Sequence, residues 1–240
     1  MKKQLTVILL SALILSGCAS GRMGNPGAIM AGVEQFRVDV KGVSSHAARP
    51  DLGVDTVLVT TTIINNLQQI VARTVSPFES AVLSVTHIEV GNTWNVLPAA
   101  GFFEGTIRTF EPKVREDVIA RFEKVVQATA DQFGAQVDIT WGNSPYVTYN
   151  DQTLTPLIFE NSKTFAEVIE TLPSTGGEDF AAYQKEIPGV FAFVGSNGEE
   201  NAPDWHHDDF LVKDEALPVA VNYYVENALF LLDYFKEQEK

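Results

Sequence analysis

The sequence predicts an α+β protein: a ferredoxin-like domain, with elements in the order β-α-β-β-α-β, followed by an incomplete α/β segment. Three observations support this fold class. Four stretches alternate apolar and polar residues, the period of a half-buried strand, and two stretches between them repeat apolar residues at helical spacing. After about residue 146 the pattern changes to helices around one continuous apolar run. The 45% hydrophobic and 10% aromatic content is typical of a folded globular chain.

The first domain is expected at residues 34–145. Its strands are expected at 34–41, 81–90, 102–110 and 136–141, and its helices at 55–73 and from Pro112 onward. Three of these elements have an apolar face at the spacing of their type. The residues are Phe36, Val38 and Val40 in the first strand, Val59, Ile63, Leu67, Ile70 and Val71 in the first helix, and Val118, Phe122, Val125 and Val126 in the second helix. Proline is favoured in the first turn of a helix. This element order predicts an antiparallel sheet with both helices on one side.

The second segment, residues 146–240, carries fewer elements. We expect a helix at 153–169, a glycine turn at 174–180 leading into a short helix, and a long amphipathic helix at 214–236. The apolar run at 189–196 is typical of a buried strand. One strand and three helices cannot form an independent α/β sheet, so this segment is expected to be part of a larger domain whose remaining strands are absent.

The first residues have the features of an export signal. Lys2 and Lys3 precede an apolar stretch, "LTVILLSALIL", which leads into "LSGC" at 15–18. This arrangement resembles a bacterial lipoprotein signal, with a signal peptide at 1–17, a lipidated Cys18 and a tether at 18–33. The resemblance implies an exported chain, lipid-anchored to a bacterial membrane on its periplasmic or cell-surface face. A buried or free thiol remains the alternative for this single cysteine.

The charge of the chain excludes one class of partner. Its formal net charge is −14, and so acidic a chain repels phosphate backbones, which argues against nucleic-acid binding. The charge otherwise indicates a solvated, acidic surface.

Three polar residues of the first domain are candidates for a site. His46, on the small-residue turn "GVSSHAARP", could donate a hydrogen bond to an oxyanion or could only cap the local backbone. Asn95, in "GNTWNVLP", could bind a ligand or simply favour the turn. Arg108 could hold a carboxylate bidentately or pair with Glu104 or another acid across strands. The remaining histidine of this domain, in the strand at 81–90, is expected to be packed there.

Two motifs of the second segment are candidates for metal or acid–base chemistry. In "STGGEDF", Gly176 and Gly177 would let a ligand approach the backbone beside Glu178. In "DWHHDDF" (204–210), His206 and His207 stand side by side among acids. Adjacent histidines seldom reach one ion, so a polar loop remains the alternative, and a catalytic zinc needs three protein ligands.

Taken in order, these segments resemble one known family. "GAIMAGVEQFRVDVKGVSSHAARP", "GNTWNVLP", "GTIRTF", "GGEDF" and "WHHDDF…DEAL" are similar to the zinc-dependent amidohydrolases and metallopeptidases of the aminoacylase, hippurate hydrolase and auxin-conjugate hydrolase group. The resemblance implies a catalytic domain with a metal centre, interrupted by a ferredoxin-like lid domain that forms a homodimer. It implies hydrolysis of N-acyl amino acids or small peptides.

The resemblance also assigns roles to the candidates. His46 would reach the partner subunit's site and polarise the scissile carbonyl. Asn95 and Arg108 would bind the tail or carboxylate of the substrate, and Gly176, Gly177 and Glu178 would line the pocket. His206 would be the last ligand of a divalent metal, zinc, with His207 as its neighbour.

Most metal ligands and the general base of that family would precede residue 27, where this sequence has its signal and tether. The chain is therefore expected to be a truncated or split amidohydrolase, inactive unless a partner chain supplies the N-terminal catalytic half. The alternative is a non-catalytic lipoprotein, a module for dimerisation or partner binding.

Overall fold

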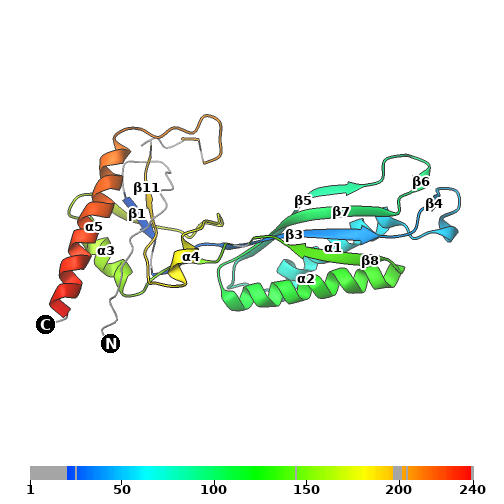
Figure 1. Ribbon diagram of the computed structural model, residues 1–240, viewed down its shortest axis with the longest axis horizontal. Coiled ribbons are helices and arrows are strands. Elements are labelled where there is room, and N and C mark those ends of the chain that lie inside the picture. The colour runs from blue at the N-terminus through cyan, green and yellow to red at the C-terminus, as the bar shows by residue number, and fades with distance from the viewer. Residues whose placement is uncertain (1–20, 25, 144, 197–201, 204, 239–240) are drawn as a thin grey trace. The chain divides into compact units, whose positions relative to one another are not determined.

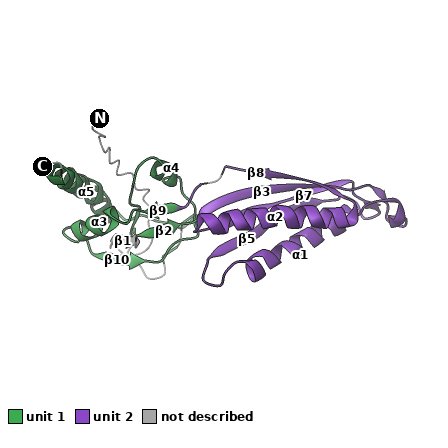
Figure 2. Cartoon of the chain, turned by 90° about the horizontal axis from the view of Figure 1, so that it is seen from below, with its two compact units in different colours: residues 1–31, 148–240 green, residues 32–147 purple. Residues whose placement is uncertain are grey.

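The computed structural model of the protein describes residues 21–24, 26–143, 145–196, 202–203 and 205–238. They divide into two compact units, one within residues 32–147 and the other made of the described parts of 1–31 and 148–240. Figure 2 shows the first unit in purple and the second in green. Residues 32–147 therefore form a unit that is inserted into the other one, between Ala31 and Thr148. In the described part of the chain, no helix has the length and apolar character needed to cross a membrane.

The unit of residues 32–147 has the predicted ferredoxin-like fold. Its elements are β3 (Gly32–Lys41), α1 (Thr56–Thr74), β5 (Ala81–Val90), β7 (Ala100–Thr109), α2 (Pro112–Phe133) and β8 (Gln136–Trp141), with two short strands, β4 (Ser45–His46) and β6 (Val96–Leu97), and a 3-10 helix at Pro50–Leu52. The sheet order is β5-β7-β3-β8, and every neighbouring pair is antiparallel. The two helices lie together on one face of this sheet (Figure 2).

The core of this unit lies between the sheet and its helices. The predicted apolar faces meet there, and their fully buried members are Phe36, Val38, Val40, Val59, Ile63, Leu67, Ile70, Val118, Phe122 and Val126. The predicted Val71 and Val125 are only partly buried, and Phe103 and Ile107 of β7 complete the core. Gly105 fits this layer because a Cβ there would lie 2.0 Å from the carbonyl oxygen of Ser84. Glu34 is also buried and is held by the guanidinium of Arg115 from α2. The period-2 and period-3.6 patterns of the sequence therefore identified this core.

The second unit contains two small sheets and three helices. The strands are β1 (Gly21–Gly24), β2 (Gly27–Met30), β9 (Thr148–Asn150), β10 (Val168–Thr171) and β11 (Ala192–Val194), and the helices are α3 (Leu154–Ser162), α4 (Ala181–Gln184) and α5 (Ala216–Gln238). β1 lies between β10, to which it is parallel, and β11, to which it is antiparallel. β2 and β9 form the second sheet.

Two apolar clusters hold this unit together. One joins α3 and α5 to the sheet through Leu154, Ile158, Val190, Ala192, Tyr223 and Leu231. The other joins Ile29, Met30, Phe180, Phe191 and Phe193, with Trp205 packed against it. Within β11, Ala192 belongs to the first cluster and Phe193 to the second, as the alternation of a strand requires. The buried strand expected here is confirmed.

Two expectations for this part of the chain are wrong. Residues 21–24 and 27–30 form strands rather than a tether, because their backbones pair with segments from the other end of the chain. The helix expected at 153–169 ends at Ser162, and residues 168–171 form β10 alongside β1. The expected signal peptide and Cys18 lie outside the described residues.

Candidate functional site

His46 and Asn95 lie together beyond one end of the four-stranded sheet, in a segment that we call the tip (residues 42–54 and 91–99). β4 and β6 pair there, with Ser45 opposite Leu97 and His46 opposite Val96 (Figure 1). The amide of Ala47 donates to the carbonyl oxygen of Asn95 at 3.0 Å. Two segments about fifty positions apart in sequence therefore present both residues from one small ribbon.

The tip leaves one nitrogen of His46 available to a ligand. The amide of Ala48 donates to Nδ1 at 3.1 Å, and the side chain is exposed. A ring nitrogen that accepts a hydrogen bond carries no proton in the neutral imidazole, so the proton lies on Nε2. His46 therefore presents an N–H donor to solvent, the group needed to polarise a carbonyl oxygen.

Arg108 lies far from this pair within the same unit. It pairs with Val33 and Val82 in the sheet, whereas Ala100, at the other end of β7, leads into the tip. Arg108 lies eight positions from Ala100 along the extended strand, roughly 27 Å. His46 and Arg108 of one subunit consequently cannot bind the same small molecule.

The helix-free face of the sheet carries a charged network that the sequence did not predict. Glu104 accepts from Arg37 Nη1 at 2.7 Å, and its other oxygen lies 2.8 Å from Nδ1 of His87. The hydrogen bonds from His87 and then Arg37 lower the pKa of the Glu104 carboxyl. His87 is thus half-exposed rather than packed, because a bulge after Val85 turns it toward Glu104. Arg37 and His87 thus both engage the Glu104 carboxylate, and the cross-strand ion pair considered for Arg108, with Glu104 or another acid, stays a prediction.

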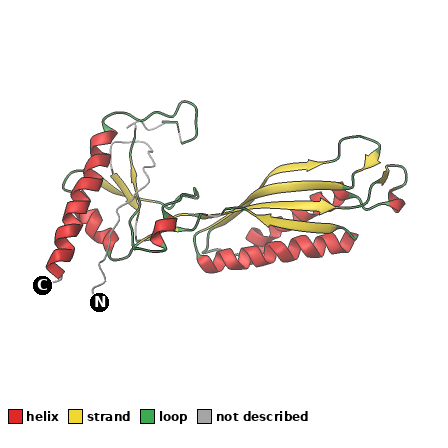
Figure 3. Ribbon diagram, in the orientation of Figure 1, coloured by secondary structure: helices red, strands yellow, loops and turns green. Residues whose placement is uncertain are grey.

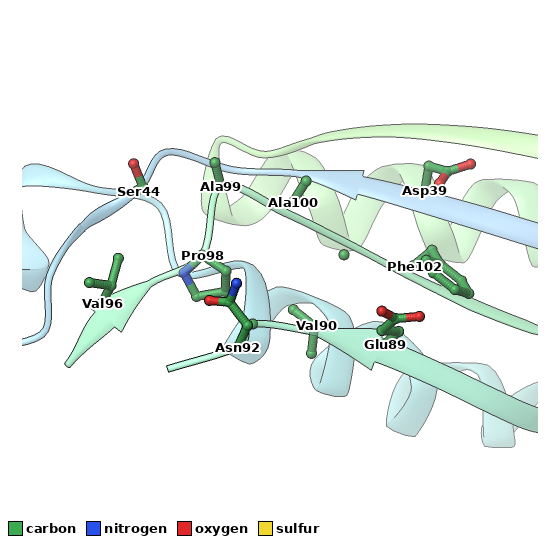
Figure 4. A pocket seen from close by; sticks show the side chains of 12 residues that line it. Asp39, Ser44, Glu89, Val90, Asn92, Val96, Pro98, Ala99, Ala100 and Phe102 are labelled. Atoms are coloured by element: carbon green, nitrogen blue, oxygen red, sulfur yellow. The ribbon is translucent and has the colours of Figure 1, made fainter. Parts of the chain in front are cut away.

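A hollow of about 490 Å³ lies between this network and the tip. Asp39 and Glu89, from β3 and β5, flank the ring of Phe102 on β7, and Asn92 and Ser44 line the hollow from the tip (Figure 4). None of these residues was a sequence candidate. They lie side by side because of the cross-strand register, which the patterns of a single sequence do not reveal.

The other unit brings the two remaining motifs together. A Cβ at Gly176 would lie 3.5 Å from the ring of Trp205 and 3.0 Å from the methyl carbon of Met30. Trp205 also packs edge-on against Phe193, with ring centroids 6.3 Å apart. The "GGEDF" segment and the histidine loop are therefore neighbours, and Trp205, which sequence reasoning missed, anchors the loop.

Glu178 is the most perturbed acid in this region. Its Oε1 lies 3.4 Å from the hydroxyl of Thr148, and its Oε2 is buried with no hydrogen-bond partner among the described residues. Burial raises the pKa of the Glu178 carboxyl, although backbone N–H groups of Phe180 and Ala181 act in the opposite direction. A buried, incompletely satisfied carboxyl of this kind is a common feature of functional sites.

The histidine loop combines backbone strain with exposed polar groups. His206 has φ +64°, in the left-handed region that residues other than glycine seldom adopt, and its side chain is exposed. His207 accepts from the amide of Asp209 at Nδ1, which also lies 3.2 Å from a carboxylate oxygen of Asp208. Strain of this kind is concentrated at functional sites.

The described residues do not by themselves form a dinuclear metal centre. Their only set of three mutually close ligand atoms, within 4.8 Å of one another, comes from His207, Asp208 and Asp209. All three side chains are exposed, they are consecutive in sequence, and they do not include His206. A two-metal site needs more donors than these three consecutive side chains supply, together with a bridging group.

The ferredoxin-like unit is similar to a known domain family. Residues 30–133 match the family model of the M20 peptidase dimerisation domain. The chain carries an M20 peptidase dimerisation domain. The match covers most of the ferredoxin-like unit, including the tip and the histidine at position 46.

The relatives of the whole chain are amide-hydrolysing enzymes by name. It is 39% identical over 223 residues to N-acetyl-L-cysteine deacetylase of Bacillus subtilis, covering 92% of this chain and 53% of that enzyme. It is 34% identical to IAA-amino acid hydrolase ILR1-like 5 of Arabidopsis thaliana, covering 86% of this chain and 50% of that protein. The chain thus spans about half the length of the curated relatives it matches.

Solved structures agree with this relationship. The YXEP protein of Bacillus subtilis, described as a dinuclear metal binding peptidase from the M20 family, is 31% identical with a TM-score of 0.74, over 94% of this chain and 56% of that one. The aminobenzoyl-glutamate utilization protein of Klebsiella pneumoniae, at 17% identity and a TM-score of 0.69 over 90% of this chain and 53% of that one, shares the fold.

Proposed function

We propose that the chain forms the dimerisation domain and C-terminal part of a metal-dependent amidohydrolase that removes the acyl group from N-acyl amino acids. One observation carries the proposal: the continuous similarity to N-acetyl-L-cysteine deacetylase over 92% of the chain, with 39% identity. The candidate residues of both units lie within it. The dimerisation-domain match further supports a homodimer.

In this proposal His46 acts at the scissile amide of a substrate held by the partner subunit. The Nε2–H group, fixed by the Ala48 amide, donates to the carbonyl oxygen as negative charge develops on it. Asn95 lies beside it and contacts the same substrate. The separation of Arg108 from His46 supports a site shared between two copies, with Arg108 holding the carboxylate of a different substrate molecule.

Gly176, Gly177 and Glu178 line the substrate pocket, and His206 contributes one ligand to a divalent metal, which we propose is zinc. The other ligands and the general base belong to the half of the fold outside the shared 53% of the relatives. We propose that the activity needs that complementary half. The strained backbone of His206 and the unsatisfied oxygen of Glu178 are consistent with residues arranged for groups from another segment.

The test is acetate release from N-acetyl-L-cysteine with zinc or manganese, using the chain co-expressed with the complementary half of the Bacillus subtilis deacetylase. We expect hydrolysis, and His46→Ala should lower kcat by about 100-fold or more because an oxyanion donor is lost. His87→Ala, the same change at another exposed histidine of the domain, should leave kcat unchanged. Equal kcat values for the two variants would remove His46 from the mechanism.

We also propose that the chain is exported and anchored through a lipid on Cys18, on the basis of the basic start, the apolar run and "LSGC". Metabolic labelling with radioactive palmitate in a bacterial host should label the chain, and Cys18→Ser should abolish the label. Labelling that persists in Cys18→Ser would contradict the anchor.

A further inference from the structure

The long helix α5 exposes a continuous apolar face. Five large aliphatic side chains are spaced by four, four, four and three positions, which places them on one side of a helix. They are 47% to 69% exposed, and we call them the α5 stripe: Leu217, Val221, Val225, Leu229 and Leu232. Exposed apolar patches of this kind mark surfaces that contact another molecule or segment.

The opposite side of α5 is already fully occupied. Ala216, Ala220, Tyr223, Asn227 and Leu231 are buried there, against α3 and the sheet. Asn227 donates to Ser162 at 3.0 Å and accepts from Asn161 at 2.9 Å, so this packing is specific. A helix that is apolar on both sides is typical of a position between two layers or neighbours. The stripe is therefore a second contact face, separate from the first.

The lengths of the relatives indicate what covers it. The chain corresponds to 53% of N-acetyl-L-cysteine deacetylase and 56% of the YXEP protein, and α5 belongs to a unit with a sheet of three short strands. In layered α/β folds, helices on the face of a sheet lie side by side and bury their apolar flanks against each other. α3 contacts the buried side of α5. The α5 stripe, on the opposite side of α5, is therefore left for a further helix.

We propose that the α5 stripe is the docking surface for a helix of the complementary half of the amidohydrolase fold, whether that half is continuous with this chain or separate from it. This inference rests on the proposed function. It adds the surface on which the two halves meet.

Two other occupants fit the observations less well. A second copy of the chain would use the dimerisation domain, and the matched residues 30–133 do not include α5. A lipid surface favours helices with many basic residues on the polar side. α5 has one basic residue, Lys236, and three acidic ones, Glu226, Asp233 and Glu237. The stripe thus suits a polypeptide of apolar helical character.

The experiment uses the full chain and a defined probe. The probe is the tagged part of Bacillus subtilis N-acetyl-L-cysteine deacetylase that lies outside the matched share, co-expressed with the chain. We expect the wild-type chain to be recovered with the tagged probe, and V225E/L229E to be recovered at least tenfold less. The control V57E/L58E makes the same change at two exposed aliphatic residues of α1 and should be recovered like the wild type.

Folding is checked by circular dichroism and thermal melting of each variant. If V225E/L229E is unfolded, V221S/L232S, a milder change on the same stripe, replaces it with the same expectation. Failure to recover the wild-type chain, or equal recovery of stripe and control variants, would overturn the proposal. So would stripe variants that abolish self-association of the chain alone, or its binding to anionic vesicles.

Activity separates this proposal from the proposed function. A complex that forms through the stripe without hydrolysing N-acetyl-L-cysteine or other N-acyl amino acids would uphold the docking surface and contradict the function. Hydrolysis with wild-type recovery but no effect of V225E/L229E would uphold the function and overturn the docking surface.

Discussion

At the scale of single residues, Glu178 shows how burial and function are linked. Its carboxyl is half-buried beside Thr148, and one oxygen finds no hydrogen bond in the described part of the chain. Keeping such a group ionised costs stability because water is replaced by a less polar surrounding. A hydrogen-bond donor or a cation bound beside the Glu178 carboxylate would offset this loss of stability.

Replacing Glu178 with the isosteric glutamine should stabilise the chain at neutral pH. Burial raises the folded pKa above the unfolded value of about 4.3, so ionisation lowers stability as pH rises from there through the folded pKa. Thermal melting by circular dichroism should give Glu178→Gln the higher Tm at pH 8, with the gap narrowing as pH falls toward 4.3.

The control is Glu186→Gln, the same substitution at an exposed position of the same unit, which should melt like the wild type. A Glu178→Gln variant that is less stable than the wild type at pH 8 would show that the carboxylate is satisfied in the folded chain.

The sequence singled out site candidates one by one, and which of them lie together is known only from the structure. His46 follows a turn of small residues and Asn95 follows Trp94, and two-residue strands bring the two together. The separation of Arg108 from them, and the network around Glu104, follow from strand register and from a bulge at residues 85–87. Register is a non-local property, and one sequence does not specify it.

At the scale of elements, caps define the helices of the dimerisation domain. The carboxylate of Asp55 accepts from the amides of Val57 and Leu58 at 3.0 and 3.1 Å, which begins α1. Gly134, with φ +70°, ends α2 in the left-handed conformation that glycine adopts without strain. Both signals are local, and the expected helix starts, at residue 55 and at Pro112, lie within one residue of those of the structure.

Asp55→Ala should therefore lower the free energy of unfolding by about 1 kcal/mol, because two amides at the start of α1 lose their acceptor. Urea denaturation of the full chain measures this. Glu116→Ala, on the exposed side of α2, should change it by less than about 0.5 kcal/mol. Equal losses for both variants would mean that the cap contributes nothing specific.

The elements of the other unit were harder to predict for a physical reason. β1, with the sequence "GRMG", has no apolar alternation, and it is a strand because β10 and β11 pair with it from residues 168–171 and 192–194. The expected helix at 153–169 is cut short for the same reason, since its last residues form β10. Tertiary pairing overrides weak local preference in such short segments.

At the scale of the whole molecule, the chain should be a dimer in solution. The M20 dimerisation-domain match suggests two subunits, and the proposed sharing of sites between copies requires them. Sedimentation equilibrium of the full chain should give twice the mass of one chain at micromolar concentration. A monomer across that range would contradict the proposed role of His46 at a partner's site.

The most direct test of the account mixes two inactive variants. His46→Ala and His206→Ala, each prepared with the complementary half, should separately show little hydrolysis of N-acetyl-L-cysteine. If each site takes His46 from one copy and His206 from the other, then dissociating and reassociating the mixture makes hybrid dimers with one intact site each. Random pairing should restore about a quarter of the wild-type rate. A mixture with no more activity than the two variants measured apart would contradict the account.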